Sequence, residues 1–202
     1  MQRVTFSELF SNPLKLSQLF DGLRQGGILA LPTDTLYGLA TDGASSKGVE
    51  AIYRLKGREG HKPLILFLSE AGQLSNLSVS VDPRNQVMLQ KHWPGALTAV
   101  FPFAGHPRLS AFPFSSLGIR VPAHPELIHF LKEYSGLLLT TSANRSNTPP
   151  LGSPDEIEQE MGTEIDWLID AGPLPEGTPS TVADFSQVPP KVLRQGKVYL
   201  HL

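Results

Sequence analysis

Residues 28–39 read ILALPTDTLYGL, and residues 54–68 read RLKGREGHKPLILFL. The apolar run at 28–31 predicts a buried strand that ends at Pro32, because proline has no N–H to donate to a central sheet ladder. The Thr-Asp-Thr triplet at 33–35 follows the carboxyl end of that strand, which is where open α/β sheets bind their ligands. The first segment therefore predicts a core strand followed by a group of hydrogen-bonding side chains.

The second segment carries basic side chains between an expected helix and an expected strand at 64–68. The cluster comprises Arg54, Lys56, Arg58, His61 and Lys62. Arg58 can donate two N–H groups to one phosphate, and Lys56 and Lys62 can add point charges. Cations also stabilise the C-terminal end of a helix dipole, so a solvated helix end is an equal alternative for Lys56 and Arg58.

Two further groups have both a structural and a functional interpretation. Ser142 and Asn144 follow an expected strand at 137–141 and point the same way if that segment is extended. The pair fits an Asx-type turn, and also a contact with a nucleotide phosphate or ribose. Arg120 lies inside an expected strand at 117–121, where a charge is usually solvated or paired; the alternative is a carboxylate anchor in a cleft.

Composition limits the classes of function. The chain has 202 residues, a formal net charge of -2 and no cysteine. A nearly neutral chain has no general attraction for polyanions, so any basic site must be local. The lack of cysteine excludes a disulfide scaffold, a thiol nucleophile and a cysteine metal site. No apolar run approaches the ~20 residues of a membrane span and the N-terminus lacks a signal-peptide core, so we expect a soluble cytoplasmic protein.

Common catalytic motifs are also absent from the sequence. It contains no G-x-x-x-x-G-K-[ST], no G-x-G-x-x-G and no H-E-x-x-H. The six histidines show no spacing typical of metal ligands. We therefore expect neither a protein nucleophile nor a structural metal, and any chemistry would depend on positioning and on charge stabilisation.

Periodicity and capping residues predict the secondary structure. Helices are expected to begin near residues 13, 46, 83, 125 and 154. Strands are expected at residues 28–31, 64–68, 97–101, 117–121, 137–141, 167–169, 180–185 and 192–193. Alternating helices and strands indicate an α/β protein, and the short late connections indicate a mixed sheet, because a parallel crossover needs a dozen or more residues. With no repeat or linker, residues 1–202 are expected to form one domain.

Six short motifs occur in one order along the chain. They read P-T-D-T-x-Y-G-L, K-G-R, W-P-G-A-L-T, G-I-R-V-P-x-H-P, T-S-A-N and P-S-T-V. Each is weak alone, but the ordered set, from about Leu14 to about Arg194, resembles the YrdC family. The resemblance implies a strongly twisted mixed sheet of the α/β (α+β) class, with flanking helices that enclose a positively charged cavity.

The resemblance also implies a nucleotidyltransferase, because known family members include threonylcarbamoyl-AMP synthases. In that reaction L-threonine and bicarbonate form N-carboxythreonine, whose carbamate oxygen attacks the α-phosphate of ATP. The products are threonylcarbamoyl-AMP and pyrophosphate, and Mg²⁺ would enter bound to ATP rather than at a dedicated protein site. A separate tRNA threonylcarbamoyl transferase complex would then modify tRNA.

By the same resemblance, individual residues acquire expected roles. The catalytic, nucleotide-facing tetrad would be Lys56, Arg58, Ser142 and Asn144. The ATP-binding residues would be Arg58, Lys62, Ser116, Ser142, Asn144 and Arg194. The threonine-binding residues would be Thr35, Arg120, Thr140 and Ser180, with Arg120 on the carboxylate. The chain departs from many relatives at Lys62 and Phe67, where they carry Asn and His. That His contacts threonine, so this part of the amino-acid site differs here.

Two alternatives remain open. A nucleic-acid-binding module without catalysis, such as a ribosome-maturation factor that contacts tRNA or double-stranded RNA, would also use a concave basic surface. The nearly neutral charge and the lack of an aromatic-basic RNA motif count against it. A related carbamoyl-adenylate enzyme with another acceptor is the second alternative, although such enzymes usually carry extra domains.

Overall fold

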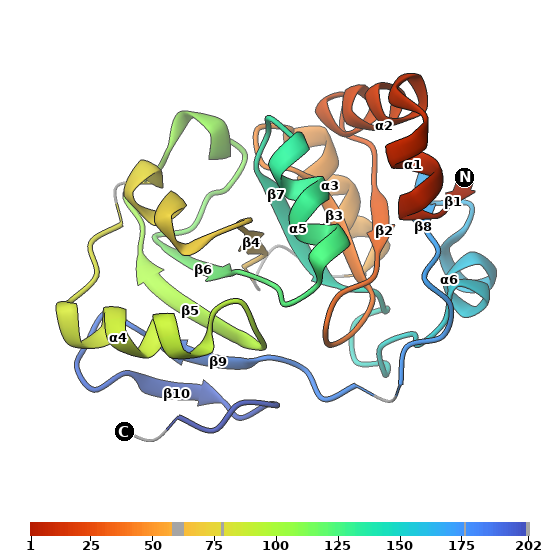
Figure 1. Cartoon of the computed structure of the whole chain (residues 1–202). Coiled ribbons are helices and arrows are strands. Elements are labelled where there is room, and N and C mark those ends of the chain that lie inside the picture. Colours follow the sequence, from red (N-terminus) through yellow and green to blue (C-terminus); the bar gives the residue numbers. More distant parts are fainter. Residues whose placement is uncertain (58–62, 78, 176, 201–202) are drawn as a thin grey trace.

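The computed structural model describes residues 1–57, 63–77, 79–175 and 177–200. Within this part of the chain one ten-stranded sheet runs in the order β1-β8-β2-β3-β7-β4-β6-β5-β9-β10. The N-terminus lies beside β1 and β8 at one side of the sheet, and β9, β10 and the C-terminal end lie at the other (Figure 1). The strands are β1 Gln2–Val4, β2 Leu29–Leu31, β3 Gly38–Asp42, β4 Ile65–Phe67, β5 Leu97–Pro102, β6 Ser116–Arg120, β7 Leu138–Ser142, β8 Trp167–Ile169, β9 Thr181–Asp184 and β10 Lys191–Arg194.

Helices flank the sheet, and all but the first begin where the sequence predicts them. They are α1 Phe6–Ser11, α2 Pro13–Arg24, α3 Ser46–Leu55, α4 Pro83–His92, α5 Pro125–Glu133 and α6 Pro154–Met161, with 3-10 turns η1 Ala71–Leu77 and η2 Pro107–Leu109. The side chains of Asn12, Ser45, Asp82 and Ser153 each accept a backbone N–H at a helix start. These caps satisfy N–H groups that have no partner inside the helix, so short polar residues before an apolar pattern set the boundaries.

The sheet is mixed, as the short connections predict. Strand β4 pairs in parallel with β6 and β5 pairs in parallel with β9, whereas β7 is antiparallel to both of its neighbours, β3 and β4. The predicted fold class is therefore confirmed.

One part of the predicted topology is wrong. Residues 38–42 form strand β3, which lies buried between β2 and β7 and is antiparallel to both. The Thr-Asp-Thr triplet follows the carboxyl end of β2, as predicted, and β2 pairs in parallel with β8; the chain then returns through the unpredicted antiparallel strand β3. The sequence G-L-A-T-D lacks an apolar alternation, and its extended form depends on the two partner strands. The short elements β1 and α1 are also absent from the prediction.

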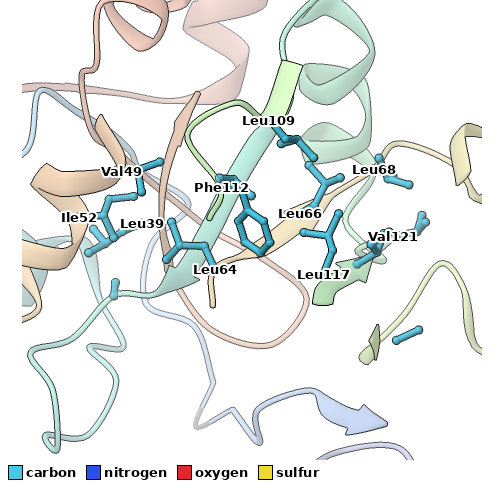
Figure 2. Packing of buried hydrophobic residues seen from close by; sticks show 14 of the residues in the cluster. Leu39, Val49, Ile52, Leu64, Leu66, Leu68, Leu109, Phe112, Leu117 and Val121 are labelled. Atoms are coloured by element: carbon cyan, nitrogen blue, oxygen red, sulfur yellow. The ribbon is translucent and has the colours of Figure 1, made fainter. Parts of the chain in front are cut away.

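Alternate residues of the strands face two different layers. Leu39, Leu66 and Leu117 face the core shared with α3, where Val49 and Ile52 are buried. Figure 2 shows Leu39, Val49, Ile52, Leu64, Leu66 and Leu117 in this cluster around Phe112. Burial of such side chains stabilises the fold by about 1.5–3 kcal/mol each.

The opposite face of the sheet is only partly covered. Helices α1, α2 and α5 pack over β8, β2, β3 and the near ends of β7 and β4, in a second cluster that contains Leu29, Leu31, Phe130 and Leu138. The same face of β6, β5, β9 and β10 contributes no residue to this cluster among the described residues. That half of the face is where the cavity described below lies. In the described ranges no helix is long and apolar enough to cross a membrane.

Candidate functional site

A cavity of about 490 Å³ lies over the part of the sheet that runs from β7 to β10. Its floor consists mainly of every second residue of neighbouring strands, because successive side chains of a strand point to opposite faces. These floor residues are Thr140 and Ser142 of β7, Ile65 and Phe67 of β4, Ser116, Gly118 and Arg120 of β6, Thr98 and Val100 of β5, Val182 of β9, and Arg194 of β10. Thr33 and Thr35 from the β2–β3 loop and Ser180 add hydroxyl groups. The cavity is large enough for a small-molecule ligand.

Arg120 lines the cavity and is held by three partners. The residue is 4% exposed. Its Nε donates to the carbonyl of Gly95 (2.9 Å), Nη1 donates to Thr35 Oγ1 (3.0 Å), and Nη2 donates to Asp34 Oδ1 (2.7 Å). A guanidinium has five N–H groups, so one N–H on each terminal nitrogen remains for a further acceptor. Two adjacent N–H groups match the two oxygens of a carboxylate.

The β2–β3 loop is preorganised around Arg120. Thr33 Oγ1 accepts the backbone N–H groups of Thr35 (3.0 Å) and Leu36 (3.1 Å), which fixes the turn. The backbone of Gly177 approaches the Thr35 carbonyl so closely that a Cβ would collide with it. The predicted Thr35 and Arg120 therefore meet because two loops and a strand are packed together around them.

Arg194 also lines the cavity, beside a pair of hydroxyl groups. Its Nη2 donates to the Ser180 carbonyl (2.8 Å) and lies 3.4 Å from Ser180 Oγ. Ser180 Oγ lies 2.9 Å from Thr98 Oγ1. Among the described residues Arg194 forms no ion pair with a carboxylate. Thr98 was not among the predicted site residues. The available signal was a polar residue inside an apolar strand, at 97–101 for Thr98 and at 117–121 for Arg120.

The two guanidinium groups influence each other. Burial lowers the pKa of Arg120, the Asp34 carboxylate raises it, and Arg194 lowers it further. Burial also lowers the pKa of Arg194. The lowering of both pKa values by burial means that the charged guanidinium groups lack the solvation they would have in water. Two partly desolvated cations, of which only Arg120 is paired with a carboxylate, indicate a site that favours an anion.

The T-S-A-N segment is held by Lys56. The Lys56 side chain is 1% exposed, and its Nζ donates to the carbonyls of Ser142 (2.7 Å) and Asn144 (2.9 Å) and to Asn144 Oδ1 (2.8 Å). Ser142 Oγ also donates to Asn144 Oδ1 (2.6 Å). Ser142 lines the cavity, whereas Lys56 and Asn144 stand behind its wall. Lys56 is therefore placed to hold the segment, and of the two interpretations weighed for it the solvated helix end is wrong, because Lys56 is buried.

The predicted site residues can now be located. Seven of them line the one cavity: Thr35, Ser116, Arg120, Thr140, Ser142, Ser180 and Arg194. Arg58 and Lys62 lie outside the described residues. Phe67 lines the cavity beside Arg120, whose Cζ lies 5.9 Å from the centre of the phenyl ring. In the described ranges no group of three or more His, Cys, Asp or Glu side chains could hold a metal ion.

Comparison with known proteins identifies the relatives of this chain. The Sua5/YciO/YrdC family model, whose description is "Telomere recombination", matches residues 21–196. A threonylcarbamoyl-AMP synthase of Bacillus subtilis is 30% identical over 194 residues, which are 95% of this chain and 56% of that protein. A threonylcarbamoyl-AMP synthase of Halorhodospira halophila is 33% identical over 160 residues, 79% of this chain and 84% of that one.

A solved structure of P. abyssi Sua5 complexed with L-threonine has the same fold. It superposes with a TM-score of 0.81 and 29% sequence identity, and the match covers 92% of this chain and 55% of that one. This chain thus spans little more than half the length of the Bacillus and P. abyssi proteins.

Proposed function

Because the chain belongs to the Sua5/YciO/YrdC family, we propose that it is an L-threonylcarbamoyladenylate synthase. The threonine amine and bicarbonate give N-carboxythreonine with loss of water. A carbamate oxygen then forms a bond to the α-phosphorus of ATP, the bond to the β-phosphate oxygen breaks, and pyrophosphate leaves. The observation that carries the proposal is that one cavity is lined both by a fixed Arg120 fork and by Arg194.

The geometry suggests where each substrate lies. Arg120 presents two N–H groups to the threonine carboxylate, and the hydroxyl groups of Thr35, Thr140 and Ser180 surround the amino acid. Arg194, Ser116 and Ser142 face the nucleotide, with Asn144 behind Ser142, and we retain Arg58 and Lys62 as further phosphate contacts. Mg²⁺ comes with ATP, held largely by phosphate oxygens and water.

The chemistry fits a site without a protein nucleophile. The attacking oxygen belongs to the substrate, so the protein must bring two anions together and stabilise the charge that gathers on the α-phosphate. Fixed donors such as Arg194 and the buried Ser142 segment do this without reorganisation during the reaction.

The direct test is release of pyrophosphate. The purified protein is incubated with ATP, Mg²⁺, bicarbonate and L-threonine, together with pyrophosphatase, and phosphate is measured. We expect phosphate release that requires both threonine and bicarbonate, with threonylcarbamoyl-AMP identified by mass spectrometry. Omitting threonine is the control for contaminating ATPases, and release that is independent of threonine would count against the function.

Gly118 offers a second test, because it lies in the cavity floor. A Cβ at this position would lie 3.3 Å from Thr98 Cγ2, which is a tight contact, and a larger side chain would also take up space in the cavity that Gly118 lines. We expect Gly118→Val to lower kcat/KM by about tenfold or more, because its methyl groups compete with the substrates for space, and to lower the free energy of unfolding by about 1–3 kcal/mol, because overpacking is destabilising. Gly118→Ala, which adds one carbon, should have a smaller effect. Unchanged kinetics in both variants would show that the substrates lie elsewhere.

The wider setting of the proposed reaction follows from its product. A tRNA threonylcarbamoyl transferase complex would consume threonylcarbamoyl-AMP in the cytoplasm, where tRNA and ATP are found.

We also propose that residues 1–202 act as one domain, since strands from both ends of the described chain join one sheet. The alternative of an RNA-binding module is less well supported, because Arg120 and Arg194 lie inside a cavity and RNA backbones need exposed cations.

A further inference from the structure

The two arginines of the cavity differ in their charge partners. Arg120 is paired with Asp34 in an ion pair of 2.7 Å, and the two side chains are 5% and 13% exposed. Arg194 has Ser180 as its hydrogen-bond partner and no carboxylate among the described residues. The charge of Arg120 is therefore offset by a carboxylate in direct contact, whereas the charge of Arg194 is not.

We propose that Asp34 is a specificity-determining residue that reserves Arg120 for the carboxylate of a zwitterionic amino acid and excludes phosphate groups from it. This inference deepens the proposed function and rests on it. The carboxylate of Asp34 does not line the cavity; it holds Arg120 from behind and cancels most of its charge.

The physical reason lies in the net charge of each ligand. A free amino acid has no net charge, so its carboxylate can accept the two remaining N–H groups of Arg120 without meeting a net repulsion. An inorganic phosphate or a nucleotide phosphate group near neutral pH carries a net negative charge of between about one and two, and it would meet the Asp34 carboxylate across the guanidinium. In a partly desolvated site such a like-charge contact is screened less than in water.

Both substrates contain an anion that suits an arginine, so some device must keep them apart. Without Asp34, Arg120 would attract phosphate as Arg194 does, and ATP or pyrophosphate could bind at Arg120 in place of the amino acid. The backbone contact of Lys197 Nζ with the Asp34 carbonyl (3.3 Å) and the fixed β2–β3 loop keep the carboxylate at this position. Selective binding thus comes from a repulsive element as well as an attractive one.

The test uses Asp34→Asn, which keeps the shape and an acceptor oxygen for Arg120 but removes the charge. L-threonine binding is measured by calorimetry at increasing concentrations of inorganic phosphate. In the unmodified protein we expect phosphate to compete weakly with L-threonine. In Asp34→Asn the inhibition constant of phosphate should fall by about tenfold or more, because one full charge beside the ligand is lost. Asp34→Glu, which restores the charge, should recover the selectivity at least in part.

Asp21→Asn is the matched control, because Asp21 also pairs with an arginine (Arg24, 2.8 Å) but is 58% exposed on α2. It should leave phosphate competition unchanged. Asp34→Asn protein that binds L-threonine but shows the phosphate competition of the unmodified protein would overturn the inference, and so would strong competition in the unmodified protein itself, a result that needs no variant to fold.

Failure of the proposed function has a different signature. In that case the unmodified protein binds no L-threonine and releases no pyrophosphate. The inference about Asp34 is then decided by phosphate alone: Asp34→Asn must bind inorganic phosphate about tenfold more tightly than the unmodified protein does, and equal affinities reject it.

Discussion

Replacing Arg120 with methionine is expected to remove threonine-dependent turnover and to destabilise the fold at the same time. Arg120 is 4% exposed, and its guanidinium donates to Gly95, Thr35 and Asp34. Methionine fills similar space but leaves the Asp34 carboxylate buried without its partner. Removing one member of a buried ion pair costs about 3–5 kcal/mol of folding free energy. Loss of the carboxylate contact should lower kcat/KM for threonine by about a hundredfold or more.

The double variant Arg120→Met/Asp34→Asn separates these two effects. With the carboxylate neutralised, the free energy of unfolding should recover in part, because no buried charge is left unpaired. Turnover should stay as low as in Arg120→Met. Denaturant unfolding measures the first quantity, and pyrophosphate release measures the second. Recovery of turnover together with stability would mean that Arg120 has a structural role alone.

An exposed ion pair provides the control for Arg120. Arg84 pairs with Asp82 (3.1 Å), and its side chain is 75% exposed. Exposed pairs contribute about 0–1 kcal/mol, so Arg84→Met should change neither stability nor turnover by a measurable amount beyond that range. A similar loss in Arg84→Met and Arg120→Met would contradict the assignment of Arg120 to the cavity.

The elements that the sequence predicts well are those with local signals. The helix starts after Asn12, Ser45, Asp82 and Ser153 each depend on a side chain that caps N–H groups within three residues. Strand β3 has no such signal, because its residues become extended through pairing with β2 and β7. The antiparallel course of the loop that carries Thr35 could not be predicted without that strand.

The same limit applies to the site. The hydroxyl and arginine residues of the cavity were recognisable as polar interruptions in apolar strands, Arg120 and Thr98 alike. Whether two such residues share a face depends on the order β7-β4-β6-β5-β9 of the sheet. Lys56 shows the difficulty most clearly. Its neighbours in sequence are basic, which indicates a phosphate site, but its position is set by the carbonyl of Ser142, 86 residues away in the chain.

For Lys56→Met we therefore expect a loss of stability as well as a loss of activity. The Lys56 ammonium donates to the carbonyls of Ser142 and Asn144 and to Asn144 Oδ1, and it is 1% exposed. Methionine leaves these buried acceptors without that donor, and each such loss costs about 1–3 kcal/mol. The free energy of unfolding should fall by about 3–5 kcal/mol, close to the cost of breaking a buried charged network. Turnover should also fall, because the activation free energy should rise by about 2–4 kcal/mol, the cost of losing a preorganised donor.

Lys47→Met is the matched control, since Lys47 lies exposed in the first turn of the same helix, α3, and should tolerate the change. Two measurements on each variant decide the role of Lys56: urea unfolding, and the kinetics of pyrophosphate release at saturating ATP and threonine. If Lys56 acts only by contacting phosphate, its variant will lose turnover and keep full stability. If it acts by holding the Ser142–Asn144 segment, the two losses will occur together, and Lys47→Met will show neither.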